Sequence, residues 1–364
     1  MEFVQERIAT LHDLTGRPPS ADLDRVAVVL PMTEREHAAL AAERLLSSLG
    51  DVAPGRVIVA LRCSPDRIQA YREWLSGFDV DLEVFWTTGP ALRERLAEHD
   101  LDGSAGKGRD VWMALGIAAA DHPYVVCHDA DAKSFTPSDI NRLAAPLQRD
   151  FSFTKGYYAR IEDNRLYGRL LRLFYVPLIR TLHELHDAPI LEYLGSFRYA
   201  LAGEFGATAE LATRFRIERR FGLEIGTLGD AFDHAGFDGT AQVDLGRYEH
   251  EHRAVSGPTG LTDMCEEVAA ALFRVIEDHD IIPDYSALQS TFRTTANELL
   301  HMYAADAAFN GLTYDAEEER EQIDVYAEAI HPTSSDDRLP PWRAVDLTPD
   351  ELLEASRTDL AAVD

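Results

Sequence analysis

The feature that most constrains the fold is a set of short apolar runs separated by helical stretches. Residues 25–31 read Arg-Val-Ala-Val-Val-Leu-Pro, and residues 124–127 read Tyr-Val-Val-Cys. Neither run alternates apolar and polar side chains, which is typical of parallel strands covered on both faces. Further strands are expected over 56–61 and 80–87. The chain is therefore predicted to form an α/β fold around a twisted, mostly parallel sheet.

Helical periodicity is expected between these strands, over 35–49, 65–76 and 108–120, and in an N-terminal helix over Glu2–Leu14. The pattern then changes. The later elements are expected as a strand over 151–158, a helix over 166–182, a helix over 221–235, a strand over 240–245 and helices from residue 260 onward. The last thirty residues read as a loosely attached surface tail.

Composition excludes several classes of protein. Asp and Glu number 63 against 35 Lys and Arg, for a formal charge of −28, so non-specific binding to nucleic acid or anionic membrane is disfavoured. Three cysteines without a CxxC spacing argue against a disulfide framework or a structural zinc. Residues 166–182 come closest to a membrane span but contain arginines, and the acidic N-terminus does not resemble a signal peptide. We expect a soluble cytoplasmic protein.

Lysine is rare in this chain. It occurs only at Lys107, Lys133 and Lys155, and the other 32 basic residues are arginine. Excess surface carboxylate with almost no lysine is typical of a protein from a salt-saturated cytoplasm, where screening is strong. The alternative is an acidic chain from a GC-rich genome. Indifference of folding and activity to molar potassium chloride would exclude the halophilic interpretation.

The sequence Asp129-Ala-Asp131 directly follows the strand predicted over 124–127. Ligands of open α/β sheets bind beyond the carboxyl ends of the strands. Side-chain alternation points both aspartates the same way, so two oxygen ligands can converge on one divalent cation. Such a cation can neutralise a diphosphate leaving group. An isolated Asp-x-Asp is more often a solvated loop or a helix cap.

A second motif, Gly106-Lys107-Gly108, precedes the helix expected over 108–120. Glycines let a phosphate approach the backbone, the start of a helix attracts it, and Lys107 adds a positive charge. The Walker A pattern fails, and no G-x-G-x-x-G follows the first strand, which argues against a dinucleotide dehydrogenase. The alternative is a flexible loop with an incidental lysine.

A third motif, Glu249-His-Glu-His-Arg253, follows the strand expected over 240–245. An imidazole from His250 or His252 could complete a mixed carboxylate–histidine site, which suits Mn²⁺ or Mg²⁺. The alternative is a surface cluster, and the spacing does not decide between the two histidines.

In their order along the chain, these motifs resemble the glucosyl-3-phosphoglycerate synthase family, retaining glycosyltransferases with the GT-A fold. The resemblance covers roughly residues 25–275. The matching stretches are Val28-Val-Leu-Pro31, Gly106-Lys-Gly-x-x-x-Trp112, Asp129-x-Asp131, Lys155-Gly-Tyr-Tyr158, Gly168-Arg169 before Pro177-Leu178, Leu201-Ala-Gly-Glu204, Leu223-Glu-Ile-Gly226, and Ala241-Gln-Val-Asp-Leu-Gly246 with His250 and Arg253.

The resemblance implies a role for each matching position. Donor-binding residues are Pro31, Lys107, Asp129 and Gly203. Acceptor-binding residues are Lys155, Gly168, Arg169 and Arg253. The metal ligands are Asp131 and His250, and the catalytic residues are Asp131 and Glu224. No protein nucleophile is assigned, because retention in this family is thought to proceed by attack on the same face of the sugar.

The implied reaction moves a hexose, with glucose favoured, from a nucleotide sugar to 3-phosphoglycerate or a similar small phosphorylated acid, using Mg²⁺ or Mn²⁺. The implied organisation is an N-terminal helical segment (1–24), a nucleotide-sugar-binding half (25–150), an acceptor-binding half (151–259), and a helical C-terminal extension with a tail (260–364). A homodimer through the C-terminal helices is one possible assembly.

Departures from the family pattern keep alternatives open. Met32-Thr-Glu-Arg35 and Leu61-Arg-Cys-Ser64 lie where the nucleotide base is read, so UDP-glucose is favoured but a GDP sugar such as GDP-mannose stays open. Leu171 and His252 leave open another acceptor, including a lipid phosphate. Two alternatives belong to other classes. One is a sugar-phosphate nucleotidyltransferase, although the glycine-rich loop that such an enzyme needs after the first strand is missing after Pro31. The other is a non-catalytic nucleotide-sugar sensor.

Overall fold

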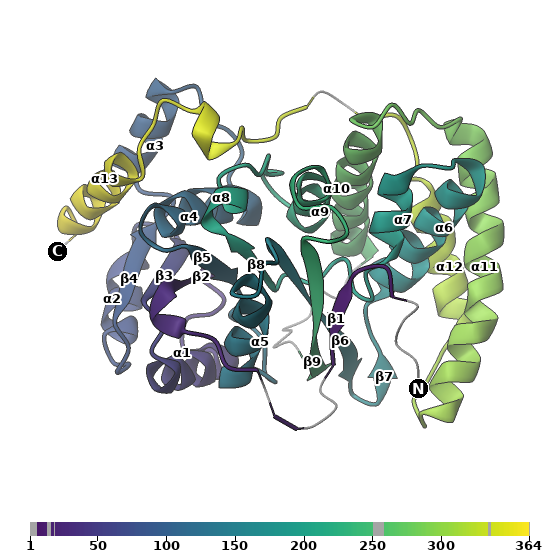
Figure 1. Cartoon of the computed structure of the whole chain (residues 1–364), viewed down its shortest axis with the longest axis horizontal. Helices are drawn as coiled ribbons and strands as arrows, with labels where there is room; N and C mark the ends of the chain where they lie inside the picture. The colour runs from purple at the N-terminus through teal and green to yellow at the C-terminus, as the bar shows by residue number, and fades with distance from the viewer. Residues whose placement is uncertain (1–5, 13–15, 18, 250–257, 334–335, 364) are drawn as a thin grey trace.

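The computed structural model describes residues 6–12, 16–17, 19–249, 258–333 and 336–363. Its centre is one twisted sheet with the strand order β1-β9-β6-β8-β5-β2-β3-β4, and β7 pairs with β6 (Figure 1). The strands are β1 (Ala9–Leu11), β2 (Val26–Thr33), β3 (Arg56–Arg62), β4 (Leu82–Trp86), β5 (Tyr124–Cys127), β6 (Phe153–Glu162), β7 (Arg165–Leu166), β8 (Phe205–Thr208) and β9 (Thr240–Tyr248). The predicted α/β fold is confirmed.

Strand β2 shows why the apolar runs do not alternate. It pairs in parallel with β3 and β5, and Val29 lies opposite both Ile58 and Cys127. Val28 and its neighbours two residues away pack with α1, α2 and α5, whereas Ala27 and Val29 belong to the core on the α4 side. Both faces of the strand are covered, so apolar side chains are favoured at every position.

Helices lie on both faces of the sheet and form a further group at one end, where α11 packs against α6 and α12 (Figure 1). The helices are α1 (Leu40–Val52), α2 (Ile68–Leu75), α3 (Pro90–Glu98), α4 (Lys107–Asp121), α5 (Pro137–Leu147), the π-helical η2 (Leu170–Tyr175), α6 (Val176–Leu185), α7 (Pro189–Gly195), α8 (Ala209–Ala212), α9 (Leu223–His234), α10 (Pro258–Glu277), α11 (Tyr285–Phe309), α12 (Ala316–Ala327) and α13 (Pro349–Ala361). Short 3₁₀ turns occupy η1 (Leu23–Arg25) and η3 (Trp342–Ala344).

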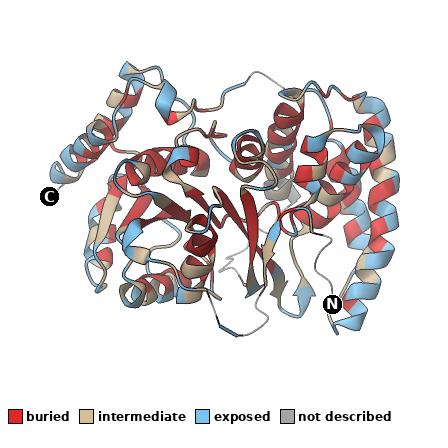
Figure 2. Cartoon of the chain, in the orientation of Figure 1, coloured by how far each residue is buried: buried red, intermediate tan, exposed pale blue. Residues whose placement is uncertain are grey.

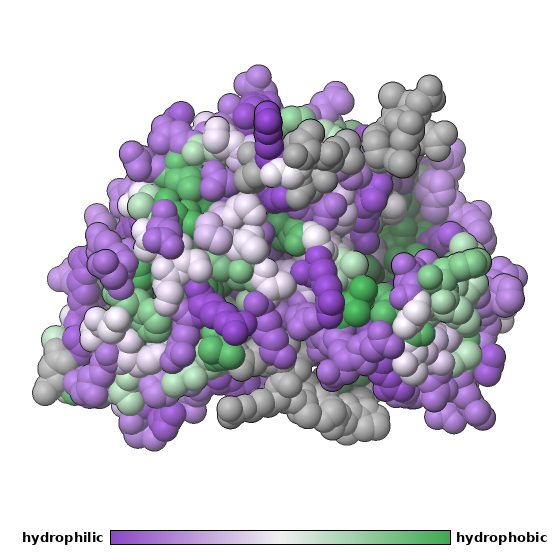
Figure 3. Space-filling model, turned by 90° about the horizontal axis from the view of Figure 1, so that it is seen from below, coloured by the Kyte–Doolittle hydropathy of each residue, from purple (hydrophilic) through white to green (hydrophobic). Residues whose placement is uncertain are grey.

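Burial is concentrated in the strands and in the helix faces that cover them, whereas the outer faces of α11 and α13 are exposed (Figure 2). The face seen from below is largely hydrophilic, with apolar side chains in smaller areas between polar ones (Figure 3). None of the helices in the described ranges is long and apolar enough to cross a membrane.

The N-terminal segment differs from its prediction. Ala9–Leu11 form β1, which pairs in parallel with β9, and Ala9 lies opposite Ala241. The helix expected over Glu2–Leu14 is therefore wrong where the structure describes this segment. The edge of β9 offers unpaired backbone donors and acceptors, and pairing with them outweighs a local helical spacing. Residues 1–5 and 13–15 lie outside the described part.

The C-terminal segment also differs from its prediction. Helix α13 crosses back to the first half of the sheet and lies beside α3 (Figure 1). Trp342 stacks on Trp112 with ring centroids 4.4 Å apart, and the Asp359 carboxylate accepts hydrogen bonds from the backbone of Ala91 and Leu92. The expected loose surface tail is therefore a packed element, because its aromatic and capping side chains have partners far away in sequence.

Candidate active site

The ends of several strands meet at one edge of the sheet. The parallel strands β2, β3 and β5 bring their carboxyl ends there, and β5 leads directly into Asp129 and Asp131. Strand β8 is antiparallel to β5, with Phe205 opposite Cys127. An antiparallel neighbour brings its amino end to this same edge. Gly203 and Glu204 therefore lie beside the aspartate motif.

Lys107, the first residue of α4, joins two carboxylates at this edge. Its Nζ lies 2.8 Å from Oδ1 of Asp129 and 3.1 Å from Oε1 of Glu224. Burial lowers the pKa of Lys107, but Asp129 and Glu224 outweigh it and raise the pKa well above its ordinary value. The structure thus brings together three predicted site residues from α4, the loop after β5 and α9.

Gly203 shows how closely this cluster is packed. A Cβ atom on this residue would lie 2.2 Å from Oδ2 of Asp129 and 2.8 Å from Nζ of Lys107. Both distances are shorter than non-bonded atoms can tolerate, so a side chain here would displace the ion pair. This packing explains why residue 203 is a glycine, and its role in donor binding stays a prediction.

The glycines of Gly106-Lys107-Gly108 serve a different contact. A Cβ on Gly108 would lie 1.7 Å from the carbonyl oxygen of Glu218, and one on Gly106 would lie 2.6 Å from that of Arg219. These glycines admit the backbone of a neighbouring segment at the start of α4. The sequence prediction gave them to a phosphate, but the structure supplies a packing reason for their small size.

Asp131 lies close to like charges. Burial, and then the neighbouring carboxylates of Asp129 and Glu36, raise the pKa of Asp131 to about 7. Within the described ranges its carboxylate makes no ion pair or hydrogen bond. A partly buried carboxylate beside two others is a group that a divalent cation would stabilise, so the residues present fit such an ion.

The remaining predicted metal and acceptor residues, His250, His252 and Arg253, lie outside the described residues. Among the residues that are described, no three histidine, cysteine or carboxylate side chains are gathered as a ready-made metal site. The pairing of Asp131 with His250 therefore stays a prediction.

Pro31 lies near the end of β2, opposite Ala60 of β3. The turns that follow these two strands are tied together, because the backbone nitrogen and hydroxyl of Ser64 donate to the Glu34 carboxylate at 2.7 and 2.6 Å. The two stretches in which the sequence departs from the family pattern are thus neighbours in space. The turn after β2 also reaches the aspartate motif, because Glu36 acts electrostatically on Asp131.

A buried polar layer under the cluster was not predicted as a unit. Glu204 is fully buried and accepts a hydrogen bond from the hydroxyl of Tyr248, whose ring stacks on Tyr158. Lys155 is 1% exposed, and its Nζ has no hydrogen-bond partner among the described residues. Burial lowers the pKa of Lys155 to about 8. The family resemblance includes the two stretches that contain these residues, Lys155-Gly-Tyr-Tyr158 and Leu201-Ala-Gly-Glu204. Nothing in the sequence indicated that the two stretches are in contact.

A cavity of about 580 Å³ opens beside this edge and extends to α12. Of the residues predicted to bind the acceptor, Gly168 and Arg169 line this cavity, whereas Lys155 does not. Gly168 has a φ of +78°, and a Cβ there would lie 2.7 Å from the Tyr199 hydroxyl, which explains the glycine. The further lining residues include Lys133, Arg160, Arg165, Tyr167, Leu201, Glu249, Thr313, Tyr314 and Asp315.

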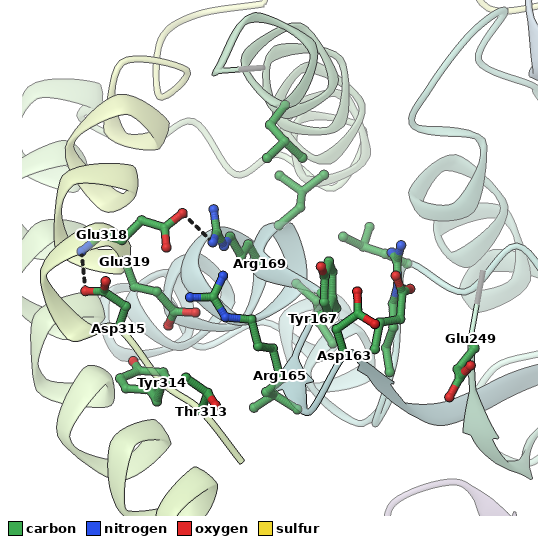
Figure 4. Close-up of a pocket in the computed structure, with 18 of the residues that line it drawn as sticks. Asp163, Arg165, Tyr167, Arg169, Glu249, Thr313, Tyr314, Asp315, Glu318 and Glu319 are labelled. Carbon is green, nitrogen blue, oxygen red and sulfur yellow. Dashed lines mark hydrogen bonds and ion pairs between the residues drawn. The ribbon is translucent and has the colours of Figure 1, made fainter. Parts of the chain in front are cut away.

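The far wall of this cavity comes from the C-terminal extension. Nη2 of Arg169 lies 2.6 Å from Oε1 of Glu318, as Figure 4 shows. Arg172 pairs with Glu319, whose side chain is 6% exposed. An acidic run such as residues 315–321 ordinarily forms a solvated face, but Glu319 of this run is buried. Charge alone gave no signal that this stretch turns toward arginines about 150 residues earlier.

Comparison with known proteins decides the family. Over 99% of this chain and 98% of the relative, the sequence is 31% identical to glucosyl-3-phosphoglycerate synthase of Methanococcoides burtonii. The chain belongs to the glucosyl-3-phosphoglycerate synthase family. The Persephonella marina glucosyl-3-phosphoglycerate synthase is 32% identical over 84% of this chain and 80% of its own length. No protein-family model matches the sequence.

Solved structures of the family agree. A glucosyl-3-phosphoglycerate synthase from Mycobacterium tuberculosis in complex with Mn²⁺, UDP and phosphoglyceric acid is 26% identical, with a TM-score of 0.57, over 76% of this chain and 87% of that one. A second structure of that enzyme holds Mn²⁺, UDP-glucose and phosphoglyceric acid and has the same TM-score over 89% of its length. The likeness confirms the GT-A architecture, and the chain is a glycosyltransferase.

Proposed function

We propose that this glycosyltransferase moves glucose from UDP-glucose to 3-phosphoglycerate, with retention of configuration and with Mn²⁺ or Mg²⁺. The observation that carries the proposal is the juxtaposition of the Lys107–Asp129–Glu224 cluster with the Arg169 cavity. It occurs in a chain that matches a glucosyl-3-phosphoglycerate synthase along nearly its whole length. The proposal assigns the cluster to the donor and the cavity to the acceptor.

On the donor side, Asp131 and His250 would hold the cation, which when bound would supply positive charge to a diphosphate leaving group. Lys107 stays charged between Asp129 and Glu224, so its ammonium group adds positive charge beside the leaving group. Pro31 and Gly203 shape the walls, and the missing side chain of Gly203 leaves room for the ion pair between Lys107 and Asp129.

On the acceptor side, Arg169 binds the phosphate of 3-phosphoglycerate through its guanidinium group, which is suited to two parallel hydrogen bonds. Gly168, which has a positive φ, and Arg169 both line the cavity. Arg253 and Lys155 complete the predicted acceptor set, although Lys155 lies beneath the donor cluster and does not line the cavity. The acceptor hydroxyl forms its bond to the anomeric carbon as the bond from that carbon to the diphosphate oxygen breaks. The hydroxyl proton passes to that leaving oxygen, and Glu224 lies beside the sugar.

The test is UDP release from UDP-glucose with and without 3-phosphoglycerate, in the presence of MnCl₂. We expect release that needs both the acceptor and the cation, that EDTA abolishes, and that yields an α-linked product by proton NMR. Faster turnover with GDP-glucose or GDP-mannose would reassign the donor. Release that does not depend on acceptor, or turnover only with another phosphorylated acid or a lipid phosphate, would refute the acceptor.

Three further expectations belong to this proposal. A homodimer would cover Met302 and Phe309, which are 59% and 91% exposed on α11, and light scattering on the purified protein tests it. The acidic, lysine-poor surface is proposed to be an adaptation to salt, so stability should rise with molar potassium chloride. A cytoplasmic location and a role in making a precursor of a compatible solute are both consistent with UDP-glucose and 3-phosphoglycerate as substrates.

A further inference from the structure

The acceptor cavity has an acidic wall that its proposed ligand does not explain. Helix α12 and the residue before it present the carboxylates of Asp315, Glu318 and Glu319 to the same space as Arg169 (Figure 4). An anionic acceptor would be repelled by such a wall unless the carboxylates are already engaged. Two of them are, since each forms an ion pair with an arginine of the facing segment.

The two ion pairs differ in a way that separates their roles. Arg172 and Glu319 form a two-pronged pair at 2.6 and 2.9 Å, with side chains 9% and 6% exposed. Arg172 also donates to the backbone carbonyls of Leu166 and Tyr167. Removing either partner would leave a buried charge, so this pair fixes α12 against η2.

The pair between Arg169 and Glu318 is single and open. It has one contact at 2.6 Å, and the side chains are 27% and 44% exposed. An exposed single ion pair is weak and readily exchanged for another anion. The Arg169 guanidinium therefore lies at the cavity wall in an ion pair with the Glu318 carboxylate, which another anion can replace.

We propose that Glu318 is a resident counter-ion of the acceptor site, which the phosphate of the acceptor replaces on Arg169. This inference rests on the proposed function, because it takes the cavity as the acceptor site. Glu318 then sets both affinity and selectivity. Only an anion that binds the guanidinium better than a carboxylate does can displace it, which favours a phosphate dianion over the carboxylate of an unphosphorylated acid.

The test is Glu318→Gln, with Glu317→Gln as a matched control. Glu317 is exposed on the same turn, does not line the cavity, and loses the same charge on substitution. We expect Glu318→Gln to lower the KM for 3-phosphoglycerate about three- to fivefold at low ionic strength, the size of one exposed ion pair. The kcat and the KM for UDP-glucose should stay unchanged. In about 1 M KCl the difference should nearly vanish, because salt screens the pair.

A second measurement keeps this proposal separate from the reaction. Calorimetric titration of the protein with inorganic phosphate reports on Arg169 without turnover, and Glu318→Gln should bind phosphate more tightly than Glu317→Gln. If the wild type makes no product from 3-phosphoglycerate, the proposed function fails, while tighter phosphate binding would still support the counter-ion. Equal binding by the two variants, or a raised KM for 3-phosphoglycerate in Glu318→Gln, would overturn it.

Discussion

The donor-side cluster and the acceptor-side cavity handle charge in opposite ways. At the sheet edge, Lys107 is fixed between Asp129 and Glu224, and Gly203 leaves no room for the cluster to shift. In the cavity, Arg169 makes one exposed ion pair with Glu318 on a distant helix. The donor cluster is therefore held in one arrangement before substrate binds, whereas another anion can replace Glu318 on Arg169.

The difference follows from what builds each region. Strand ends of a single sheet hold the donor cluster, so its geometry is inherited from backbone pairing. The cavity is built from β7, η2 and the C-terminal α12, whose positions depend on side-chain packing. Substitutions in the cluster should therefore damage the chemistry, whereas those in the cavity should change the affinity for one substrate.

The largest effect is expected from Asp131→Asn. This change removes the anionic ligand of the proposed cation, and losing a metal ligand should lower kcat/KM about a thousandfold. The measurement is UDP release across a MnCl₂ titration. Asp150→Asn is the control, since Asp150 is exposed and has a φ of +70° that asparagine also adopts. If Asp131→Asn kept the manganese dependence of the wild type, Asp131 would not be a ligand of the proposed cation, and the contrast between donor cluster and acceptor cavity would fail.

The next effect is expected from Gly203→Ala. The added methyl group would meet Asp129 and Lys107 at distances that force their ion pair apart. Activity should fall about a hundredfold, with a raised KM for UDP-glucose, because preorganised charge is lost. Gly195→Ala is the matched control, since its nearest contact is an ordinary 3.4 Å to Ile179. Equal activity of the two variants would contradict a tightly packed cluster.

A smaller and more selective effect is expected from Arg169→Ala. Loss of one charged contact to phosphate should raise the KM for 3-phosphoglycerate about thirtyfold and leave the KM for UDP-glucose nearly unchanged. Arg180→Ala, which removes an exposed arginine of α6, should change neither. Initial rates with each substrate varied in turn give the answer. Equal loss of affinity for both substrates would remove the distinction between the two regions.

The same contrast explains what the sequence could predict. The position of Asp129 and Asp131 at the end of a buried strand was predicted correctly, because the apolar run before them is clear in the sequence. Gly203 was predicted from the family resemblance, and only the pairing of β8 with β5 shows that it lies beside them. Glu318 and Glu319 could not be placed, since an acidic helix reads alike whether its carboxylates meet solvent or arginines. Trp342 and β1 were missed for the same reason, because their partners are far away in sequence.

The smallest effect concerns stability and Lys155, which lies beneath the donor cluster. The groups that act on it electrostatically are Glu224, Glu204, Lys107 and Cys127. Because burial lowers the pKa of Lys155 to about 8 from its ordinary 10.5, the unfolded chain binds more protons than the folded one between those values. The contribution of Lys155 to the free energy of unfolding therefore rises as the pH increases from about 8 to 10.5.

Lys155→Met keeps the length of the side chain and removes its titration. Between pH 7.5 and 9.5, the free energy of unfolding of the wild type should rise relative to that of the variant by about 2 kcal/mol. Urea denaturation at both pH values measures this, with Lys133→Met as the control, because Lys133 is exposed. If wild type and Lys155→Met showed parallel pH dependence, Lys155 would be charged and paired in the folded protein. The charges of the layer beneath the donor cluster would then be as well compensated as those of the cluster itself.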